Sequence, residues 1–325
     1  MPLCPKRLGL LVSTLAALAT FGSGARAAPF AFVPNEKASS VSVIDVAADR
    51  VVTQIAAGKR PRGIAYTNGK LLITDGSTGD LLVIDAATGS VNRTIHIGSS
   101  PEGVYTSADG KLAAVAVEEG NEVLFLDTST WAKVFSVKTE GKNPEHAVFS
   151  PDGRFVYASA EEAEQVDVID VAARKLVASI PVGKRPRGIG FTPDARIAYV
   201  ACELDNGIYV IDAVKHVVLK RLPGGNYPNG VAITPDGTQA FVSNGRGESV
   251  TAINARTHEI TGTIGVGKRP WNMAIAPDGK KLYVANGRSN SVSVIDTVSR
   301  TKSSDIAVGE LPWGVVIGPT GPGTK

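Results

Sequence analysis

The chain has 325 residues, of which 43% are hydrophobic and 20% charged, with 34 Lys and Arg against 31 Asp and Glu. Three of the basic residues lie within the first 27, so the rest of the chain holds 31 charges of each sign and is formally neutral. That balance argues against a nucleic-acid partner, which requires a basic surface. No low-complexity tract or block of like charge interrupts the chain, so we predict a single domain with an extensive core.

The N-terminus has the pattern of a secretory signal peptide. Lys6 and Arg7 precede an apolar run over residues 8–21, and Ala25-Arg26-Ala27 offers a cleavage site between small residues. The apolar run is too short to span a membrane. We therefore expect residues 1–27 to be removed, and the mature protein to be periplasmic or secreted without an anchor or a membrane span.

Two anchors recur along the rest of the chain at spacings of 40 to 43 residues. The first anchor is a proline, found at Pro61, Pro101, Pro144, Pro186, Pro228, Pro270 and Pro312. The second is the polar end of an apolar strand, found at Asp45, Asp85, Asp127, Asp170, Asp212, Asn254 and Asp296. Each anchor occurs seven times, and a repeat of this length is typical of a β-propeller.

Residues 267–309 illustrate how one repeat folds. Pro277-Asp278-Gly279 suits a type I turn, because proline presets φ and glycine closes the turn. Val292 and Val294 alternate with polar residues as in a half-buried strand, and Asn286-Gly287 tolerates a turn between strands. Each repeat therefore encodes four short strands. We predict an all-β, seven-bladed β-propeller over residues 28–319, followed by a disordered tail over residues 320–325.

The two ends of the repeat array are complementary. Ala31-Phe32-Val33 matches the second strand of a repeat and Ser42-Val43-Ile44-Asp45 the third, whereas the C-terminal Pro312-Trp313-Gly314 begins a first strand. We therefore expect one C-terminal strand to join three N-terminal strands in the last blade. Closing the ring in this way removes exposed sheet edges.

These repeats resemble the YVTN family of β-propeller repeats, whose unit reads roughly PDGkxlYVaNxxxxxVsVID. Residues 277–296 match this unit almost completely, and residues 151–170, 193–212 and 235–254 are clear copies. The motif specifies a fold but not an activity, because propellers host many functions.

The ends of the chain also resemble the PQQ-dependent catabolism-associated β-propeller proteins. Asn35-Glu36-Lys37 and Gly58-Lys59-Arg60-Pro61-Arg62-Gly63 look like the start of that family, and Leu311-Pro312-Trp313-Gly314 looks like its end. The resemblance implies an exported accessory of quinoprotein alcohol oxidation, with no settled activity of its own.

The first strand of each blade lines the central channel of a propeller, so the residue after each repeat proline should lie at one channel mouth. In blade order these residues are Arg62, Glu102, Glu145, Arg187, Asn229, Trp271 and Trp313. Trp271, Trp313 and Arg62 are neighbours once the ring closes. Two indoles beside a guanidinium could stack on and pair with a planar anion such as PQQ.

We therefore name Arg62, Arg187, Asn229, Trp271 and Trp313 as ligand-binding candidates, with no intrinsic cofactor expected. The alternative is that the tryptophans fill the channel and Arg62 pairs with Glu102. The dipeptides Lys59-Arg60, Lys184-Arg185 and Lys268-Arg269 surround the same mouth and are interpreted as a solvated rim.

A second set of polar residues follows the second strand of each blade. The Asn copies in this set read as turn formers, whereas blades in the middle of the chain carry Glu118, Glu161 and Glu203. Clustered carboxylates could bind Ca²⁺, although no EF-hand spacing supports it, or could face a partner protein.

Catalysis has less support in the sequence. Propeller lactonases use His, Glu and Arg at the channel mouth, which makes Glu102, Glu145 and His146 the best acid–base candidates. Adjacent residues of a strand point to opposite faces, which weakens a pairing of Glu145 with His146. We interpret the protein as a monomeric, non-catalytic binding or scaffold propeller. A lactonase-type hydrolase and a cell-envelope interaction protein are the alternatives.

Overall fold

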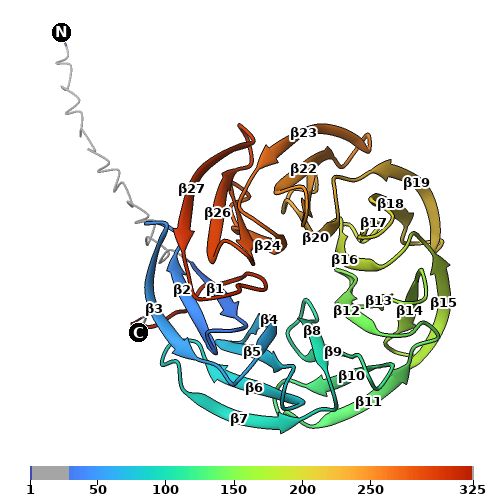
Figure 1. Ribbon diagram of the computed structural model, residues 1–325, viewed down its shortest axis with the longest axis horizontal. Coiled ribbons are helices and arrows are strands. Elements are labelled where there is room, and N and C mark those ends of the chain that lie inside the picture. The colour runs from blue at the N-terminus through green and yellow to red at the C-terminus, as the bar shows by residue number, and fades with distance from the viewer. Residues whose placement is uncertain (2–28, 324–325) are drawn as a thin grey trace.

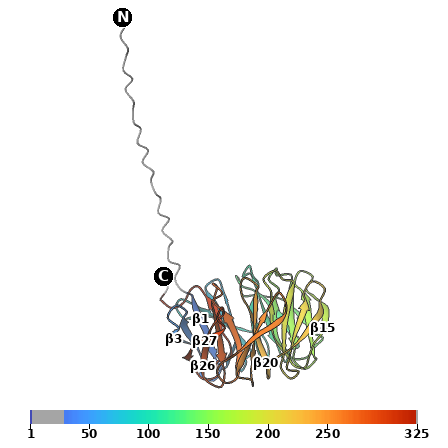
Figure 2. The same cartoon turned by 90° about the horizontal axis from the view of Figure 1, so that it is seen from above.

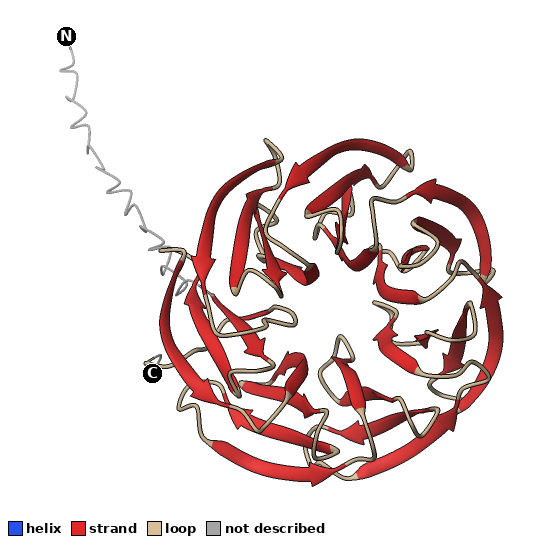
Figure 3. Cartoon of the chain, viewed as in Figure 1, coloured by secondary structure: helices blue, strands red, loops and turns tan. Residues whose placement is uncertain are grey.

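A computed structural model describes residues 29–323 together with Met1, and the predicted signal peptide lies outside these residues except for Met1. Over the described part, the chain forms seven four-stranded antiparallel sheets around a central axis (Figure 1). All regular structure in this part is strand, joined by short loops (Figure 3). A search of the same part finds no helix that is long and apolar enough to span a bilayer. The seven-bladed, all-β fold predicted from the repeats is confirmed.

The blades are numbered here from the one that closes the ring. Blade 1 consists of β28 (Val316–Gly318), β1 (Phe30–Asn35), β2 (Ser40–Asp45) and β3 (Arg50–Ala56). Blade 2 consists of β4 (Pro61–Thr67), β5 (Lys70–Asp75), β6 (Asp80–Asp85) and β7 (Val91–His96). Blade 3 consists of β8 (Pro101–Thr106), β9 (Leu112–Val117), β10 (Glu122–Asp127) and β11 (Lys133–Lys138). Blade 4 consists of β12 (Pro144–Phe149), β13 (Phe155–Ala160), β14 (Gln165–Asp170) and β15 (Lys175–Pro181).

The remaining three blades follow the same order. Blade 5 consists of β16 (Pro186–Phe191), β17 (Ile197–Cys202), β18 (Gly207–Asp212) and β19 (Val217–Pro223). Blade 6 consists of β20 (Pro228–Ile233), β21 (Gln239–Asn244), β22 (Ser249–Asn254) and β23 (Glu259–Gly265). Blade 7 consists of β24 (Pro270–Ile275), β25 (Lys281–Asn286), β26 (Ser291–Asp296) and β27 (Thr301–Ala307).

The ring closes through the two ends of the chain. Strand β28 pairs antiparallel with β1, with Ala31 opposite Ile317, so blade 1 combines one C-terminal and three N-terminal strands as predicted. The amide of Trp313 adds a hydrogen bond to the carbonyl oxygen of Pro34, at 2.9 Å. The result is a flat ring in which the sheets stand side by side (Figure 2). Of the expected tail, residues 320–323 are described and Gly321 is buried beside Phe30.

The repeated aspartate has a local structural cause. At the end of each third strand its side-chain oxygen accepts hydrogen bonds from backbone amides two or three residues later, as Asp296 does from Val298 and Ser299 at 3.0 and 2.7 Å. In blade 6 the amide oxygen of Asn254 takes the same role. This Asx turn fixes the reversal into the fourth strand. The Pro-Asp-Gly turn at the same end of the blade places Gly279 at a φ of 77°, which glycine adopts without steric cost.

The core lies between the blades. Buried apolar side chains form seven clusters in the described chain, and each cluster is shared by two adjacent blades; the cluster joining blades 1 and 7, for example, includes Ala31, Ile44, Tyr283 and Val292. Both neighbours contribute to each cluster, so stability depends on the closed ring. The starts of the first strands and the ends of the second strands lie at the same end of the blades, and this end forms the channel mouth.

Candidate functional site at the channel mouth

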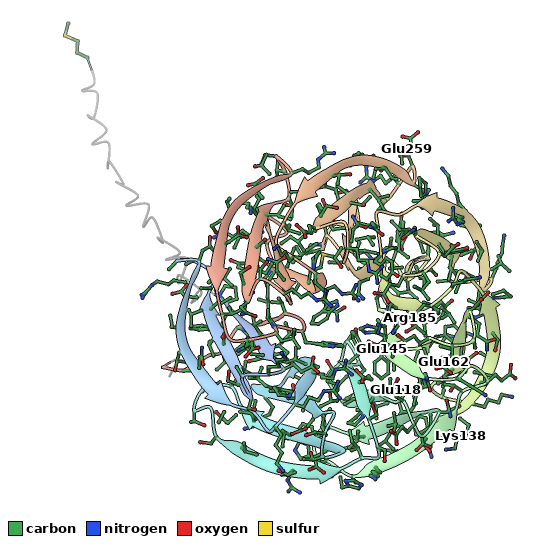
Figure 4. The ribbon with its side chains drawn as sticks, viewed as in Figure 1. Glu118, Lys138, Glu145, Glu162, Arg185 and Glu259 are labelled. Atoms are coloured by element: carbon green, nitrogen blue, oxygen red, sulfur yellow. The ribbon has the colours of Figure 1, made fainter. Side chains whose placement is uncertain are left out.

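Four of the residues that follow the repeat prolines form two ion pairs at the channel mouth. Arg62 forms an ion pair with Glu102 of the next blade. Arg187 forms an ion pair with Glu145, with 2.5 Å between Nη1 and Oε1. These four side chains come from the starts of β4, β8, β12 and β16, so the two glutamates are neighbours and an arginine lies on each side of them. Figure 4 labels Glu145 beside the central opening.

Two glutamates that directly follow second strands extend this network. Glu161 lies 3.0 Å from Arg187 and 2.5 Å from Arg185, and Glu203 lies 3.3 Å from Arg187 and 2.7 Å from Arg269. In blade 1 the equivalent residue is Glu36, which pairs with Arg60. In blades 6 and 7 it is Gly245 and Gly287, whose amides make the same backbone hydrogen bond to the residue before the repeat proline but which have no side chain. Glutamate at this position therefore supplies the carboxylate that reaches the arginines.

The mouth network is electrically neutral and largely withdrawn from water. It contains five arginines and five glutamates: Arg60, Arg62, Arg185, Arg187 and Arg269 with Glu36, Glu102, Glu145, Glu161 and Glu203. Glu102 and Glu203 have no exposed surface. Burying so many charges is tolerable only because each has a partner of opposite sign.

Burial also shifts the proton affinities of this network. Burial, and after it the charge of Glu145, raises the pKa of Glu102 well above its ordinary range, against the opposing charge of Arg62. Oε2 of Glu102 and Nε of Arg62 are buried without a hydrogen-bond partner among the described residues. Burial lowers the pKa of Arg187, but the charges of Glu145, Glu161 and Glu203 outweigh it and hold the pKa above its ordinary value.

Trp313 and His146 fill the channel beneath the charges. Trp313 is 6% exposed, and its ring lies 5.8 Å from that of His146 on β12, centroid to centroid. Nδ1 of His146 lies 2.5 Å from the hydroxyl of Tyr105. Burial, with smaller effects from Arg187 and Arg62, lowers the pKa of His146 to about 3, so its imidazole is neutral at physiological pH. The cavity left in the channel measures only about 90 Å³.

Glycines two residues after the repeat proline allow the first strands to approach closely. A Cβ added to Gly63 would collide with the backbone oxygen of Glu102, and one added to Gly188 with that of Asn229. The narrow channel therefore depends on glycine at these positions.

The five ligand-binding candidates are not equally accessible. Arg62 and Arg187 are occupied by glutamates, and Asn229 and Trp313 are buried. Trp271 alone among them is half-buried without an ion pair, packed over Gly287 with the guanidinium carbon of Arg269 5.9 Å from its ring centroid.

The acid–base and metal candidates are also held in contacts. Glu145 points to Arg187 whereas His146 points to Tyr105, so these neighbours do not face each other. Glu161 and Glu203 bind arginines, and Glu118 accepts a hydrogen bond from the hydroxyl of Ser100 at 2.7 Å. Within residues 29–323, no group of three or more His, Cys, Asp or Glu side chains is placed to hold a metal ion.

Sequence reasoning missed four members of the network, namely Glu36, Arg60, Arg185 and Arg269. The arginines of the Lys-Arg dipeptides, interpreted as part of a solvated rim, also pair with glutamates, although the side chains of Arg60 and Arg185 stay 43% and 38% exposed. The position of these arginines in the repeat could have revealed them, because each of them directly precedes a repeat proline.

Comparisons with known proteins agree with this architecture. The family model described as "Lactonase, 7-bladed beta-propeller" matches residues 170–304, less than half of the chain. The chain is a seven-bladed β-propeller. Over 93 residues this propeller is 32% identical to the uncharacterized protein YncE of Salmonella typhi and, equally, to that of Salmonella typhimurium. Each alignment covers 27% of this chain and only 26% of the relative.

Two solved structures resemble this propeller along most of its length. Hydrazine synthase of Kuenenia stuttgartiensis superposes with a TM-score of 0.76 at 24% identity, covering 87% of this chain and 99% of that one. A protein of unknown function from Desulfotomaculum acetoxidans superposes with a TM-score of 0.78 at 18% identity, covering 90% and 99%. At these identities the likeness extends to the fold alone.

Proposed function

We propose that this propeller is an exported, non-catalytic binding protein that holds a protein partner on the face around its channel mouth. The observation that carries the proposal is the network of five arginines and five glutamates above Trp313, in which every arginine contacts a glutamate. Its charges are committed to one another, so they build a rigid platform instead of a reacting group that water and substrate can reach.

The surface around this platform has a charge pattern suited to a protein partner. Glu119, Glu162 and Glu164 are exposed in the turns after β9 and β13, and no ion pair engages them within the described chain. Figure 4 labels Glu162 outward from Glu145 on this side of the ring. Complementary charge of this kind speeds encounter and selects a partner with a basic surface.

The resemblance of the chain ends to PQQ-dependent catabolism-associated propellers suggests the partner. We propose a periplasmic PQQ-dependent alcohol dehydrogenase, for which this propeller would be an accessory. PQQ itself does not fit the five candidates in this conformation, because Trp313 is buried against His146 and both arginines are paired. Titrating the protein with PQQ while following Trp fluorescence, with Trp271→Ala as the matched variant, tests that exclusion.

The decisive experiment measures binding to the purified dehydrogenase of the same host by biolayer interferometry. Glu162→Lys reverses a charge on the mouth face, and Glu259→Lys reverses an exposed charge at the opposite ends of the strands. We expect saturable binding that weakens at least tenfold in Glu162→Lys and is unchanged in Glu259→Lys. Absence of binding, or equal loss in both variants, would overturn the partner assignment.

A lactone hydrolase is the second candidate. It is favoured by the match of residues 170–304 to the lactonase family model and by the raised pKa of Glu102, a property of general acids. Assaying a panel of γ- and δ-lactones with the native protein and with Glu145→Gln separates the two proposals. Hydrolysis above the background rate that disappears in Glu145→Gln would replace the binding role with catalysis.

A further inference from the structure

A second feature of the mouth face lies away from the axis, at the junction of blades 6 and 7. A hollow of about 400 Å³ is lined by Gly245, Arg246, Glu248, Lys268, Arg269 and Arg288. These residues come from the turn after β21, the loop before β24 and the turn after β25. Its volume falls within the range of small-molecule sites.

The hollow has an excess of positive charge that the protein does not neutralise. Arg269 reaches inward to Glu203, but Arg246, Lys268 and Arg288 form no ion pair with any acidic side chain of residues 29–323. Glu248 is the one carboxylate in the lining, against four cations. This differs sharply from the central network, where every arginine has a glutamate.

Two of the four cations stack on the same aromatic ring. The guanidinium carbon of Arg246 lies 3.8 Å from the ring centroid of Tyr227, and that of Arg269 lies 5.7 Å from the same ring. Stacking on an aromatic face restricts an arginine side chain while leaving its N–H groups free to donate.

Backbone hydrogen bonds also tie the three loops together. The amide of Arg288 donates to the carbonyl oxygen of Lys268 at 3.1 Å, and that of Arg246 to Asn226 at 3.1 Å. The amide of Lys268 donates to the hydroxyl of Ser289 at 2.7 Å. These bonds fix the backbone of the loops that carry the cations.

We propose that this hollow binds a small anion carrying two or more carboxylate or phosphate groups. Three unneutralised cations around one cavity match several negative groups, and arginine can bind each group through two N–H donors. An extended polyanion fits less well, because Glu119 and Glu162 on the same face repel it. This site is independent of the proposed protein partner.

Isothermal titration calorimetry of the native protein with citrate and with pyrophosphate, at low ionic strength, tests the proposal. We expect one site for at least one of the two anions, with a Kd that rises with salt. The two probes distinguish a polycarboxylate site from a phosphate site. No saturable heat with either anion would overturn the proposal.

Variants locate the site. Arg246→Ala and Arg288→Ala should each raise Kd at least tenfold, whereas Arg256→Ala, an exposed arginine at the opposite end of blade 6, should leave Kd unchanged. Equal weakening by Arg256→Ala would mean diffuse attraction and would overturn the proposal. If an alanine variant does not fold, Lys268→Gln provides the same comparison, because Lys268 is exposed and makes no side-chain hydrogen bond within the described chain.

Discussion

The indole of Trp313 lies 5.8 Å from the imidazole of His146, centroid to centroid, although the two residues belong to blades 1 and 4. Blade 1 and blade 4 stand on opposite sides of the ring, so Trp313 reaches across the channel. Its backbone is held by β1 through Pro34 and by Asn272 of blade 7. A single side chain therefore links distant blades and closes the channel at the same time.

Replacing Trp313 with alanine should remove this link and leave a cavity. We expect Trp313→Ala to lower the free energy of unfolding by about 3 kcal/mol, as for other buried aromatic residues. Urea denaturation measures the loss. Trp271→Ala is the matched control and should cost less, because Trp271 is only half-buried. A larger loss in Trp271→Ala than in Trp313→Ala would contradict the channel closure.

His146 should make the propeller sensitive to acid. Its pKa is lowered from 6.5 to about 3, chiefly by burial and also by Arg187 and Arg62. Between these pH values the unfolded chain takes up a proton that the folded chain does not, so the free energy of unfolding falls as the pH falls. At about 1.4 kcal/mol per pH unit, the loss at pH 4 is on the order of 3 kcal/mol.

Urea unfolding of the native protein and of His146→Gln between pH 4 and 7.5 checks this expectation. The variant should lack most of the acid-dependent loss. Glu102 acts in the opposite direction, because its raised pKa lets the folded chain keep a proton as the pH rises, so stability falls with rising pH there. Both the native protein and His146→Gln contain Glu102, so the difference between their pH profiles isolates the contribution of the histidine. Parallel pH profiles would show that His146 does not titrate in this way.

The fold could be predicted from the sequence because the backbone conformation requires particular residue types at fixed points of each repeat. A proline presets φ where each first strand begins, and an aspartate such as Asp296 forms an Asx turn where each third strand ends. The proline and the Asx-turn residue each occur once per repeat, so the number of repeats in the sequence gives the number of blades. Closure followed from the same reasoning, since Ala31 and Ile317 belong to complementary parts of one repeat.

The site was predictable only in part, because the repeat fixes backbone positions and leaves the reach of long side chains open. The contact between Arg62 and Glu102 follows from their ring order. The contact between Trp313 and His146 does not, since these residues belong to blades 1 and 4, which are not neighbours. Nor does the sequence reveal that Glu203 meets Arg269, because these residues lie 66 positions apart and in different parts of the repeat.

Arg187 should be the most important charge of the mouth network. Removing it would leave Glu145, Glu161 and Glu203 partly unpaired in a buried environment. We expect Arg187→Met to cost about 3–5 kcal/mol of unfolding free energy. Adding Glu145→Gln should restore part of the loss, because one buried carboxylate is removed with its partner. Urea denaturation of the single and double variants measures both effects.

The matched control for this charge is Arg221→Met. Arg221 pairs with Asp205 at 3.1 Å but is half exposed, so water screens the pair. Its loss should change the unfolding free energy by less than about 1 kcal/mol. Equal losses in Arg187→Met and Arg221→Met would show that the mouth network contributes no more than a surface pair.

Tyrosine hydroxyls on second strands join neighbouring blades on their outer side. The hydroxyl of Tyr157 lies 2.7 Å from Nδ1 of His216, and that of Tyr199 lies 2.6 Å from Nδ1 of His258. The hydroxyl of Tyr283 lies 2.5 Å from Asp49 across the closing junction. The histidines in the connecting turns therefore hold blades together and are not part of the mouth.

Each of these contacts can be removed without changing the packing. Tyr199→Phe keeps the ring and deletes the hydroxyl, so we expect a loss of about 1 kcal/mol of unfolding free energy. The control is Tyr66→Phe, because the Tyr66 hydroxyl has no hydrogen-bond partner in the described chain while its ring stacks on Phe32. Urea denaturation should show no loss in the control. If both variants unfold at the native midpoint, the contact between Tyr199 and His258 does not stabilise the junction of blades 5 and 6, and apolar burial alone holds it.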